Sequence, residues 1–233
     1  MPEPSYDSQR PEILPKFQDE DIPEMAARIM TVAVYLFAQK GYSATSVREI
    51  VQQADVTNPM LYYYFQSKAG LFSELVRYLF ESMEEDVTAA IADADGLTDK
   101  LDAIIWSHLD ACRRAPVVLS FVYSVLFGPQ TNRPEFDIFS RHVRMLATIV
   151  NIFEDAIERG EFVPAGDYSA LFLTHQFFGL LNGHLMRTIK MVEVIEPREK
   201  RREYLDELLS REQGSQLTHF FLSGAGTISH NEN

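Results

Sequence analysis

The chain of 233 residues contains a single cysteine, Cys112, so no disulfide can form within it. No basic and apolar leader segment ending in small residues opens the chain. Disulfides are typical of oxidising compartments, and leaders direct export. Both absences lead us to expect a protein of the reducing cytoplasm.

Long apolar runs are also missing. The longest nearly apolar stretch, Val117–Phe127, spans eleven residues and contains two serines, whereas a membrane-spanning helix needs about twenty apolar residues. We therefore expect no transmembrane span. The chain also lacks the alternating apolar pattern of strands, internal repeats and low-complexity tracts.

Signatures of catalysis are absent as well. The serine, cysteine, histidine and carboxylate residues do not show the spacing of a nucleophile, a metal site or a phosphate-binding loop. His108 and Cys112 lie four residues apart and could share one helical face, but a zinc site needs a third or fourth ligand. We predict no enzyme activity, no cofactor and no metal site.

Charge is distributed unevenly. The formal net charge is −13, which by itself argues against a nucleic-acid partner. Acids exceed bases by four in residues 1–21 and by nine in residues 76–233, but residues 22–75 hold four of each. A neutral segment in an acidic protein is compatible with a module that faces phosphates, although many neutral domains bind no nucleic acid.

Apolar residues recur at helical spacing through most of the chain, which predicts an all-α fold of about nine helices. Four prolines among polar residues in the first twenty positions predict a flexible arm instead. We expect helices from Pro23 to Gly41, from Ser46 over about nine residues, from Thr57 to Phe65, from Gly70 to Gly96, from Thr98 to Cys112, from Pro116 to Gly128, from Ile138 to Gly160, from Asp167 to about Lys190, and from Pro197 to Phe221.

The second and third helices carry clear local signals. Ser46 and Glu49 have the spacing of a capping box. Asp55 tolerates the left-handed conformation of a tight turn, and Thr57 can cap the next helix. The pattern predicts two short helices joined by a turn of three or four residues.

Two segments carry a family resemblance: Gly41-Tyr42-Ser43-Ala44-Thr45-Ser46-Val47-Arg48-Glu49-Ile50 and Ala54-Asp55-Val56-Thr57-Asn58-Pro59-Met60-Leu61-Tyr62-Tyr63-Tyr64-Phe65-Gln66-Ser67-Lys68. Over roughly residues 22–72 the chain resembles the DNA-binding domain of TetR-family transcriptional regulators. The resemblance implies a two-fold dimer, a helix-turn-helix that reads a palindromic operator, and a variable C-terminal domain that binds a small effector. We accordingly expect an arm over 1–21, a helix-turn-helix domain over 22–72, a helical effector-binding and dimerisation domain over 73–223, and a flexible tail over 224–233.

The third helix is the candidate DNA reader. A helix that enters the major groove is anchored on one side and exposes donors, acceptors and apolar tips on the other. Leu61 and Phe65, four residues apart, can form the anchor. Asn58 could pair with adenine and Met60 could contact a thymine methyl group. The predicted DNA-binding residues are Thr45, Arg48, Thr57, Asn58, Pro59, Met60, Tyr62, Tyr63, Tyr64 and Lys68.

More than one role is possible for several of the predicted DNA-binding residues. By resemblance, Tyr63, Thr45 and Lys68 hold phosphates, and Arg48 reaches a guanine or a phosphate. The three tyrosines could instead form a half-buried helix face, Thr45 could only cap a helix, and Lys68 could be a solvated lysine. The chain departs from the common family pattern at Asp55 (usually glycine), Val51 (usually alanine) and Tyr64 (usually histidine), which puts the operator sequence in doubt.

The C-terminal body is rich in aromatic residues, most of which we expect in the core. Apolar cavities with a few polar groups bind small ligands, so we predict an apolar or amphipathic effector. The predicted effector-binding residues are Trp106, His108, Tyr123, Phe127, Arg144, His175, Phe178 and Asn182. By resemblance, the last two helices form the dimer interface, with Gly179, Gly183, Leu217, Phe220 and Phe221 as candidates; the two glycines could instead admit a ligand or a helix of the same chain.

These observations favour a homodimeric, ligand-responsive DNA-binding regulator, usually a repressor in this family. Its partners would be double-stranded operator DNA, a small-molecule effector and a second copy of the chain, and no membrane. The alternative is a ligand-binding or scaffold protein whose helix-turn-helix no longer reads DNA, which the acidic balance and Asp55 motivate. Catalysis is the least favoured class.

Overall fold

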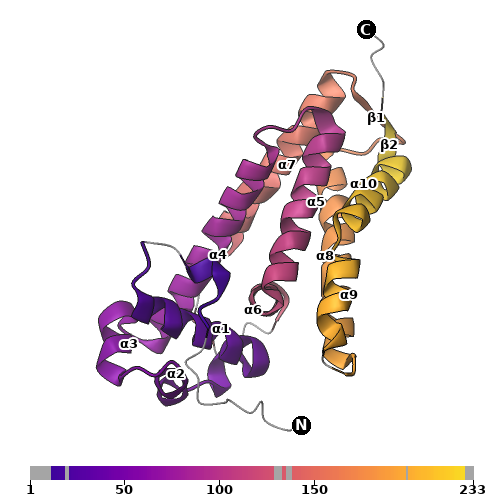
Figure 1. The fold of residues 1–233 in the computed structure, drawn as a ribbon. Coiled ribbons are helices and arrows are strands. Elements are labelled where there is room, and N and C mark those ends of the chain that lie inside the picture. Colours follow the sequence, from indigo (N-terminus) through magenta and orange to yellow (C-terminus); the bar gives the residue numbers. More distant parts are fainter. Residues whose placement is uncertain (1–11, 19–20, 129–132, 135–137, 198, 229–233) are drawn as a thin grey trace. The chain divides into compact units, whose positions relative to one another are not determined.

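The computed structural model describes residues 12–18, 21–128, 133–134, 138–197 and 199–228. Over these residues it confirms the predicted all-α fold (Figure 1). The elements are a 3-10 helix η1 (Pro15–Phe17), helices α1 (Glu24–Ala44), α2 (Val47–Gln53), α3 (Asn58–Phe65), α4 (Lys68–Ile91), α5 (Gly96–Arg114), α6 (Pro116–Phe127), α7 (Ile138–Glu158), strand β1 (Phe162–Pro164), helices α8 (Ala170–Val194), α9 (Lys200–Leu208), α10 (Arg211–Ala225), and strand β2 (Gly226–Ile228).

The chain divides into two compact units. The first contains α1, α2, α3, the part of α4 up to Leu79, and α6; the second contains the rest of α4 and the helices α5 and α7 to α10. The assignment of α6 to the first unit could not be foreseen from chain order. The domain boundaries expected from the resemblance remain a prediction.

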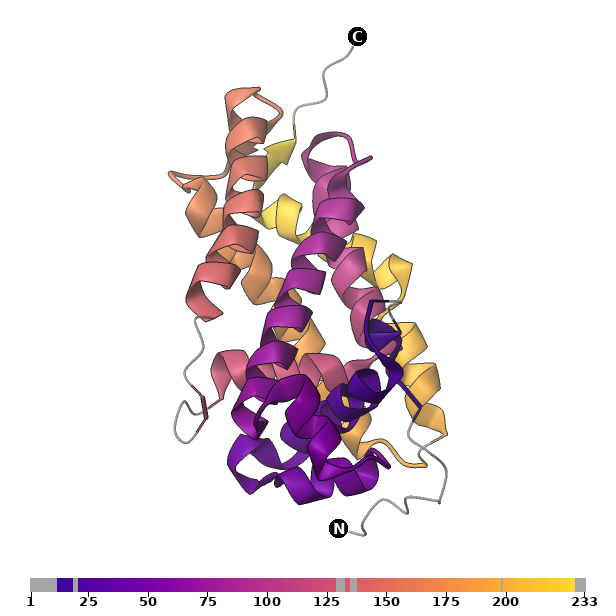
Figure 2. The same cartoon turned by 90° about the vertical axis from the view of Figure 1, so that its left-hand side faces the viewer.

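The helix-turn-helix of the first unit forms as its local signals indicate, and α1, α2 and α3 gather together in both ribbon views (Figures 1 and 2). Gly41 bends the end of α1 with a φ of 82°, and Asp55 adopts a φ of 53° in the turn between α2 and α3. Leu61 and Phe65 are both buried, as the anchoring role requires. Thr57 occupies the N-cap of α3, but its side chain makes no capping hydrogen bond.

Aromatic rings hold α6 against α1 and α4 within the first unit. Phe121 stacks on Phe37 with 6.1 Å between ring centroids and meets Phe72 edge-on at 5.7 Å. Tyr42 completes the cluster, with its ring 5.1 Å from that of Phe72. Because buried aromatic contacts contribute beyond their area, this cluster fixes the end of α1 to the start of α4.

Part of the expected N-terminal arm packs against the first unit. Phe17 is 1% exposed and Leu14 is 6% exposed. The Tyr78 hydroxyl donates to the Lys16 carbonyl at 2.9 Å, and the Leu14 amide donates to the Thr31 hydroxyl at 3.1 Å. Two apolar residues were too weak a pattern to predict this contact. Residues 1–11 and 19–20 of the expected arm lie outside the described part of the chain.

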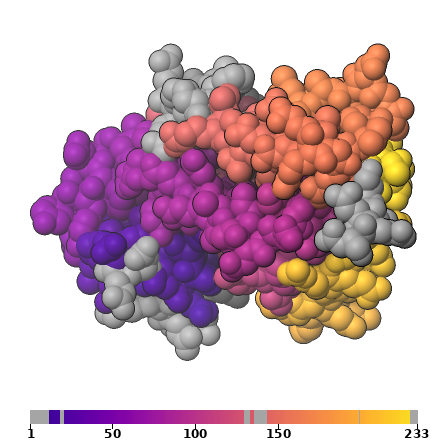
Figure 3. All heavy atoms as spheres, turned by 90° about the horizontal axis from the view of Figure 1, so that it is seen from above, coloured from indigo at the N-terminus to yellow at the C-terminus, as the bar shows by residue number. Residues whose placement is uncertain are grey.

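In the second unit, α5 packs closely against α10. Gly214 brings α10 close to α5, because a Cβ there would lie 3.4 Å from Leu109 Cδ1 and 3.5 Å from Ile105 Cγ2. The Asp102 carboxylate accepts from Ser215 Oγ at 3.0 Å and from Thr218 Oγ1 at 3.2 Å. In the space-filling view, atoms of α7 lie against those of the second half of α4 (Figure 3), where Arg144 pairs with Glu84 at 3.2 Å.

Four expectations for the second unit were wrong. Helix α5 begins at Gly96, with Asp95 as its N-cap, instead of at Thr98. The predicted last helix is two helices, because the chain breaks at Leu209 and Ser210, whose side chain caps α10 by accepting from the Gln213 amide. Helix α8 begins with Ser169 as its cap instead of Asp167. Two short antiparallel strands, β1 and β2, pair Phe162 with Ile228; three residues are too few to show an alternating pattern. Of the expected tail, residues 229–233 lie outside the described part.

Candidate nucleic-acid interface

Helix α3 exposes one face of polar and aromatic side chains. Tyr63 is 80% exposed and Tyr62 is 50% exposed. Asn58 and Pro59 are also exposed, whereas Met60 and Tyr64 are half-buried. The rings of Tyr63 and Tyr64 meet edge-on at 5.0 Å. An exposed aromatic face beside a buried Leu61 and Phe65 has the two-sided character that a groove-binding helix requires.

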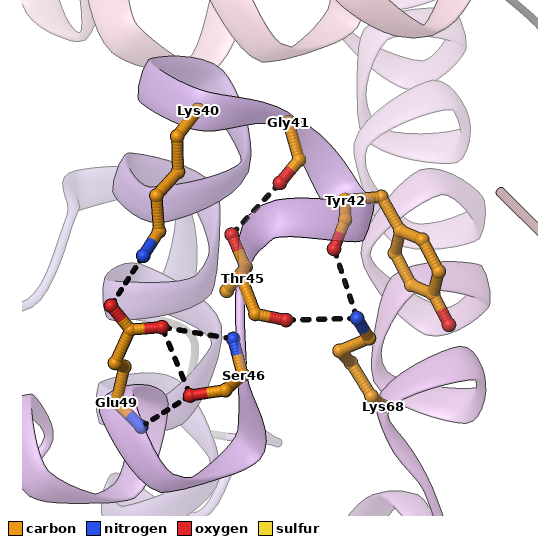
Figure 4. A network of polar contacts seen from close by, with 7 residues as sticks. All are labelled: Lys40, Gly41, Tyr42, Thr45, Ser46, Glu49 and Lys68. Carbon is orange, nitrogen blue, oxygen red and sulfur yellow. Dashed lines mark hydrogen bonds and ion pairs between the residues drawn. The ribbon is translucent and has the colours of Figure 1, made fainter. Parts of the chain in front are cut away.

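The capping box at the start of α2 is complete (Figure 4). The Ser46 hydroxyl accepts from the Glu49 amide at 3.2 Å, and Glu49 Oε2 accepts from the Ser46 amide at 3.0 Å. Lys40 pairs with the other carboxylate oxygen of Glu49. Lys40 and the hydrogen bonds from Ser46 lower the pKa of Glu49 to about 2. Glu49 therefore stabilises the end of α1 against the start of α2.

Thr45 is 1% exposed, and its hydroxyl donates to the Gly41 carbonyl at 2.9 Å. The side chain therefore lies inside the bend at the end of α1 and stabilises that bend. In this conformation the hydroxyl does not face solvent, where a phosphate would approach. The bent end of α1 is drawn in Figure 4.

Lys68 lies at the first position of α4 and reaches back to the α1–α2 connection (Figure 4). Its ammonium donates to the Tyr42 carbonyl at 2.9 Å and to the Thr45 carbonyl at 2.8 Å. The same ammonium lies 4.1 Å from the centre of the Tyr42 ring. Burial lowers the pKa of Lys68 and raises that of Tyr42. Sequence reasoning missed Tyr42 as a functional partner, although it lies in the motif that carried the resemblance.

Arg48 and Thr57 also have exposed side chains. Arg48 is exposed near the start of α2, and Thr57 is exposed directly before α3. The predicted DNA-binding residues thus fall into two groups. Arg48, Thr57 and the residues of α3 offer exposed or half-exposed side chains, while Thr45 and Lys68 bind backbone carbonyls.

The predicted effector residues are divided between the two units. Tyr123 and Phe127 belong to α6 in the first unit, where Tyr123 is buried and Phe127 is 61% exposed. In the second unit, buried His108 of α5 lies 6.4 Å from the ring of Phe178 of α8. Trp106 lies under Arg211 at 5.4 Å, Asn182 is half-buried, and Arg144 and His175 are exposed.

Helices α5 and α8 of the second unit each carry a buried polar side chain, His108 and Thr174. Burial lowers the pKa of His108, which favours the neutral ring, and its Nδ1 lies 2.9 Å from the Ile104 carbonyl oxygen. One helical turn before Phe178, Thr174 Oγ1 is buried and has no hydrogen-bond partner among the described residues. A buried polar atom without a partner is unusual.

The candidate dimer residues differ in exposure. Gly179 and Gly183 lie on the exposed side of α8, and no atom of the residues that the structure describes lies within 4 Å of a Cβ built at either position. Phe220 of α10 is 71% exposed, and Leu217 is half-buried. Phe221 is 8% exposed and packs on Phe177 at 5.5 Å between ring centroids, so it belongs to the core of the second unit.

An exposed helix that follows a short turn in an all-α chain is typical of helix-turn-helix DNA-binding proteins. Residues 29–75 match the model of the family described as "Bacterial regulatory proteins, tetR family". The helix-turn-helix of this chain is therefore that of the TetR family of bacterial regulators.

Curated proteins and solved structures resemble the chain over most of its length. The chain is 27% identical over 194 residues to the probable HTH-type transcriptional regulator YttP of Bacillus subtilis, covering 78% of this chain and 80% of YttP. It is 24% identical over 147 residues to the HTH-type transcriptional repressor KstR2 of Mycolicibacterium smegmatis, covering 62% and 70%. The fold resembles that of the transcriptional regulator FadR from Bacillus subtilis in complex with stearoyl-CoA, with a TM-score of 0.57, 17% identity, and coverage of 79% and 97%.

Among the described residues, none of the helices is long and apolar enough to cross a membrane. Within that same part of the chain, no three His, Cys, Asp or Glu side chains are grouped as metal ligands.

Proposed function

We propose that the protein is a homodimeric repressor that binds a palindromic operator in the cytoplasm and releases it when a small apolar or amphipathic effector binds. The exposed face of α3 carries this proposal. Tyr62 and Tyr63 are too large and too exposed to contribute much to folding, but they suit contacts with phosphates and base edges. Asn58 at the start of the helix suits adenine, whose N6 and N7 atoms match an amide side chain.

Dimerisation would pair the outer faces of α8 and α10. Gly179 and Gly183 leave room for a close helix approach, and exposed Phe220 supplies an apolar contact. A two-fold dimer presents two copies of α3, which successive major grooves accept when they lie roughly 34–36 Å apart. The proposed domain boundaries follow the resemblance: DNA binding over 22–72, and effector binding with dimerisation over 73–223.

The effector would lie in the second unit, among α5 and α8. His108 and Thr174 could supply the polar contacts there, and Phe178 an apolar wall. The relative FadR was solved with stearoyl-CoA, an amphipathic ligand. Effector binding would tilt the second half of α4 and thereby change the separation of the two recognition helices. To reverse operator occupancy from about 99:1 to 1:99, the effector must favour the released state by about 5.5 kcal/mol.

The test is selection of fragmented genomic DNA by the purified protein, followed by gel-shift titration of the enriched fragment. We expect enrichment of a short palindrome, two subunits for each bound fragment, and release of the fragment by stearoyl-CoA or another ligand that combines an apolar body with a polar head. Absence of any enriched sequence at low salt would favour the alternative, a ligand-binding protein whose helix-turn-helix no longer reads DNA.

A further inference from the structure

Lys68 occupies an unusual position between the two parts of the helix-turn-helix. It is the first residue of α4, and only Gln66 and Ser67 separate it from the end of α3. This junction is tightly built, because a Cβ at Gly70 would lie 2.0 Å from the Phe65 carbonyl oxygen, and the Gly70 amide donates to Ser67 Oγ at 2.9 Å. The backbone of Lys68 is therefore held firmly at the end of the recognition helix.

The side chain of Lys68 points away from this junction, toward the α1–α2 connection (Figure 4). Its two hydrogen bonds end on the carbonyls of Tyr42 and Thr45, at 2.9 and 2.8 Å. Both carbonyls follow the bend at Gly41, where the backbone has left the regular helix with a φ of 82°. Carbonyls at a helix end lack helical partners, and a charged donor satisfies them better than a neutral one.

The geometry leaves little of the ammonium for DNA. A lysine ammonium has three N–H groups, of which two point to the carbonyls, while the Tyr42 ring covers the charge at 4.1 Å. Tyr42 is itself fixed by Phe72, so its ring cannot turn aside without disturbing the aromatic cluster. If Lys68 exchanged the two carbonyls for a phosphate, the Thr45 carbonyl would lose this charged donor, and the Tyr42 carbonyl would keep only the Thr45 amide, at 3.3 Å.

We infer that Lys68 is a positioning residue, which binds the carbonyls of Tyr42 and Thr45 and so fixes the α1–α2 connection against the end of α3. It orients Arg48 and the start of α2 relative to the recognition helix, and it does not itself neutralise a phosphate. The inference rests on the proposed operator binding and changes the role that the family resemblance implies for this lysine.

Three roles of Lys68 predict different binding data. A phosphate contact supports specific and non-specific binding alike, so its loss weakens both and reduces the slope of log K against log salt by about 0.9 for each phosphate. A merely structural role lowers the folded fraction and weakens both kinds of binding equally. A positioning residue aligns base contacts, so its loss weakens specific binding, whereas non-specific binding and the salt slope stay as they were.

The experiment compares the parent, Lys68→Met and the matched variant Arg48→Met, each of which removes one positive charge per subunit from this surface. Binding is titrated against the selected genomic fragment and a scrambled duplex of equal length, over a series of salt concentrations, with thermal melting as a check of folding. For Lys68→Met we expect a loss of about tenfold or more on the selected fragment, less than twofold on the scrambled duplex, and an unchanged salt slope.

Hydrogen exchange of the free proteins gives a second readout. Lys68→Met should speed exchange of the amides between Ser43 and Val47, and Arg48→Met should not. If Lys68→Met loses equal affinity for both duplexes, or if its salt slope is lower by about 0.9 per subunit, the inference is overturned. If the parent binds no DNA, the proposed function fails instead, and the hydrogen exchange still decides whether Lys68 holds the connection.

Discussion

Replacing Tyr63 by alanine should weaken operator binding strongly and leave the fold intact. The side chain is 80% exposed, so its loss should change the free energy of unfolding by less than about 1 kcal/mol, including its edge-on contact with Tyr64. A hydrogen bond from its hydroxyl to a phosphate contributes about 1.5 kcal/mol. Two copies in a dimer contribute about 3 kcal/mol, so affinity for the selected fragment should fall about 100-fold.

The assay pairs this variant with Tyr204→Ala, which removes a 39% exposed tyrosine from α9. Gel-shift titration measures affinity, thermal melting checks the fold, and light scattering checks the subunit number. Tyr204→Ala should bind like the parent. If folded Tyr63→Ala dimers also bind like the parent, the assignment of the α3 face to DNA is refuted.

Three further predictions follow from buried and paired groups. Phe221→Ala should lower the free energy of unfolding by about 3–5 kcal/mol, because Phe221 packs in the core. Phe220→Ala should instead weaken dimerisation, which sedimentation measures. Equal effects of both changes on folding would contradict this division. Glu49 has a pKa of about 2 in the folded protein, below its value in the unfolded chain, so its contribution to stability is present above about pH 4.3 and is lost toward pH 2. The stability difference between the parent and Glu49→Gln in urea titrations should shrink over that range, and a difference independent of pH would exclude the mechanism. Burial lowers the pKa of His108, so this histidine binds a proton more readily in the unfolded chain than in the folded protein. The free energy of unfolding should therefore fall as the pH drops below about 6.5. His108→Phe should show a smaller fall, and a pH profile identical to that of the parent would contradict the role of His108.

The helix-turn-helix was predictable because its signals are local. Ser46 and Glu49 lie three residues apart and form their capping box within one turn. Leu61 and Phe65 lie one turn apart on α3 and are buried together. Asp55 adopts the left-handed conformation that its short polar side chain tolerates. Such signals need no knowledge of distant partners.

Features that depend on distant partners were not predictable. Burial of Thr45 depends on the bend at Gly41, which turns the carbonyl toward its hydroxyl. The contacts of Lys68 join residues 23 and 26 positions apart. The packing of Phe121 with Phe37 and Phe72 places α6 in the first unit, although its sequence neighbours α5 and α7 belong to the second.

Cross-linking from position 63 tests most directly whether the exposed face of α3 binds the operator. Tyr63 is replaced by a photoreactive phenylalanine analogue, the protein is bound to the selected genomic fragment and irradiated, and the linked nucleotides are mapped. The account predicts links inside both halves of a palindrome, one helical turn apart, and none from the same analogue at position 204. A protein that binds the fragment but yields no link from position 63 would contradict it.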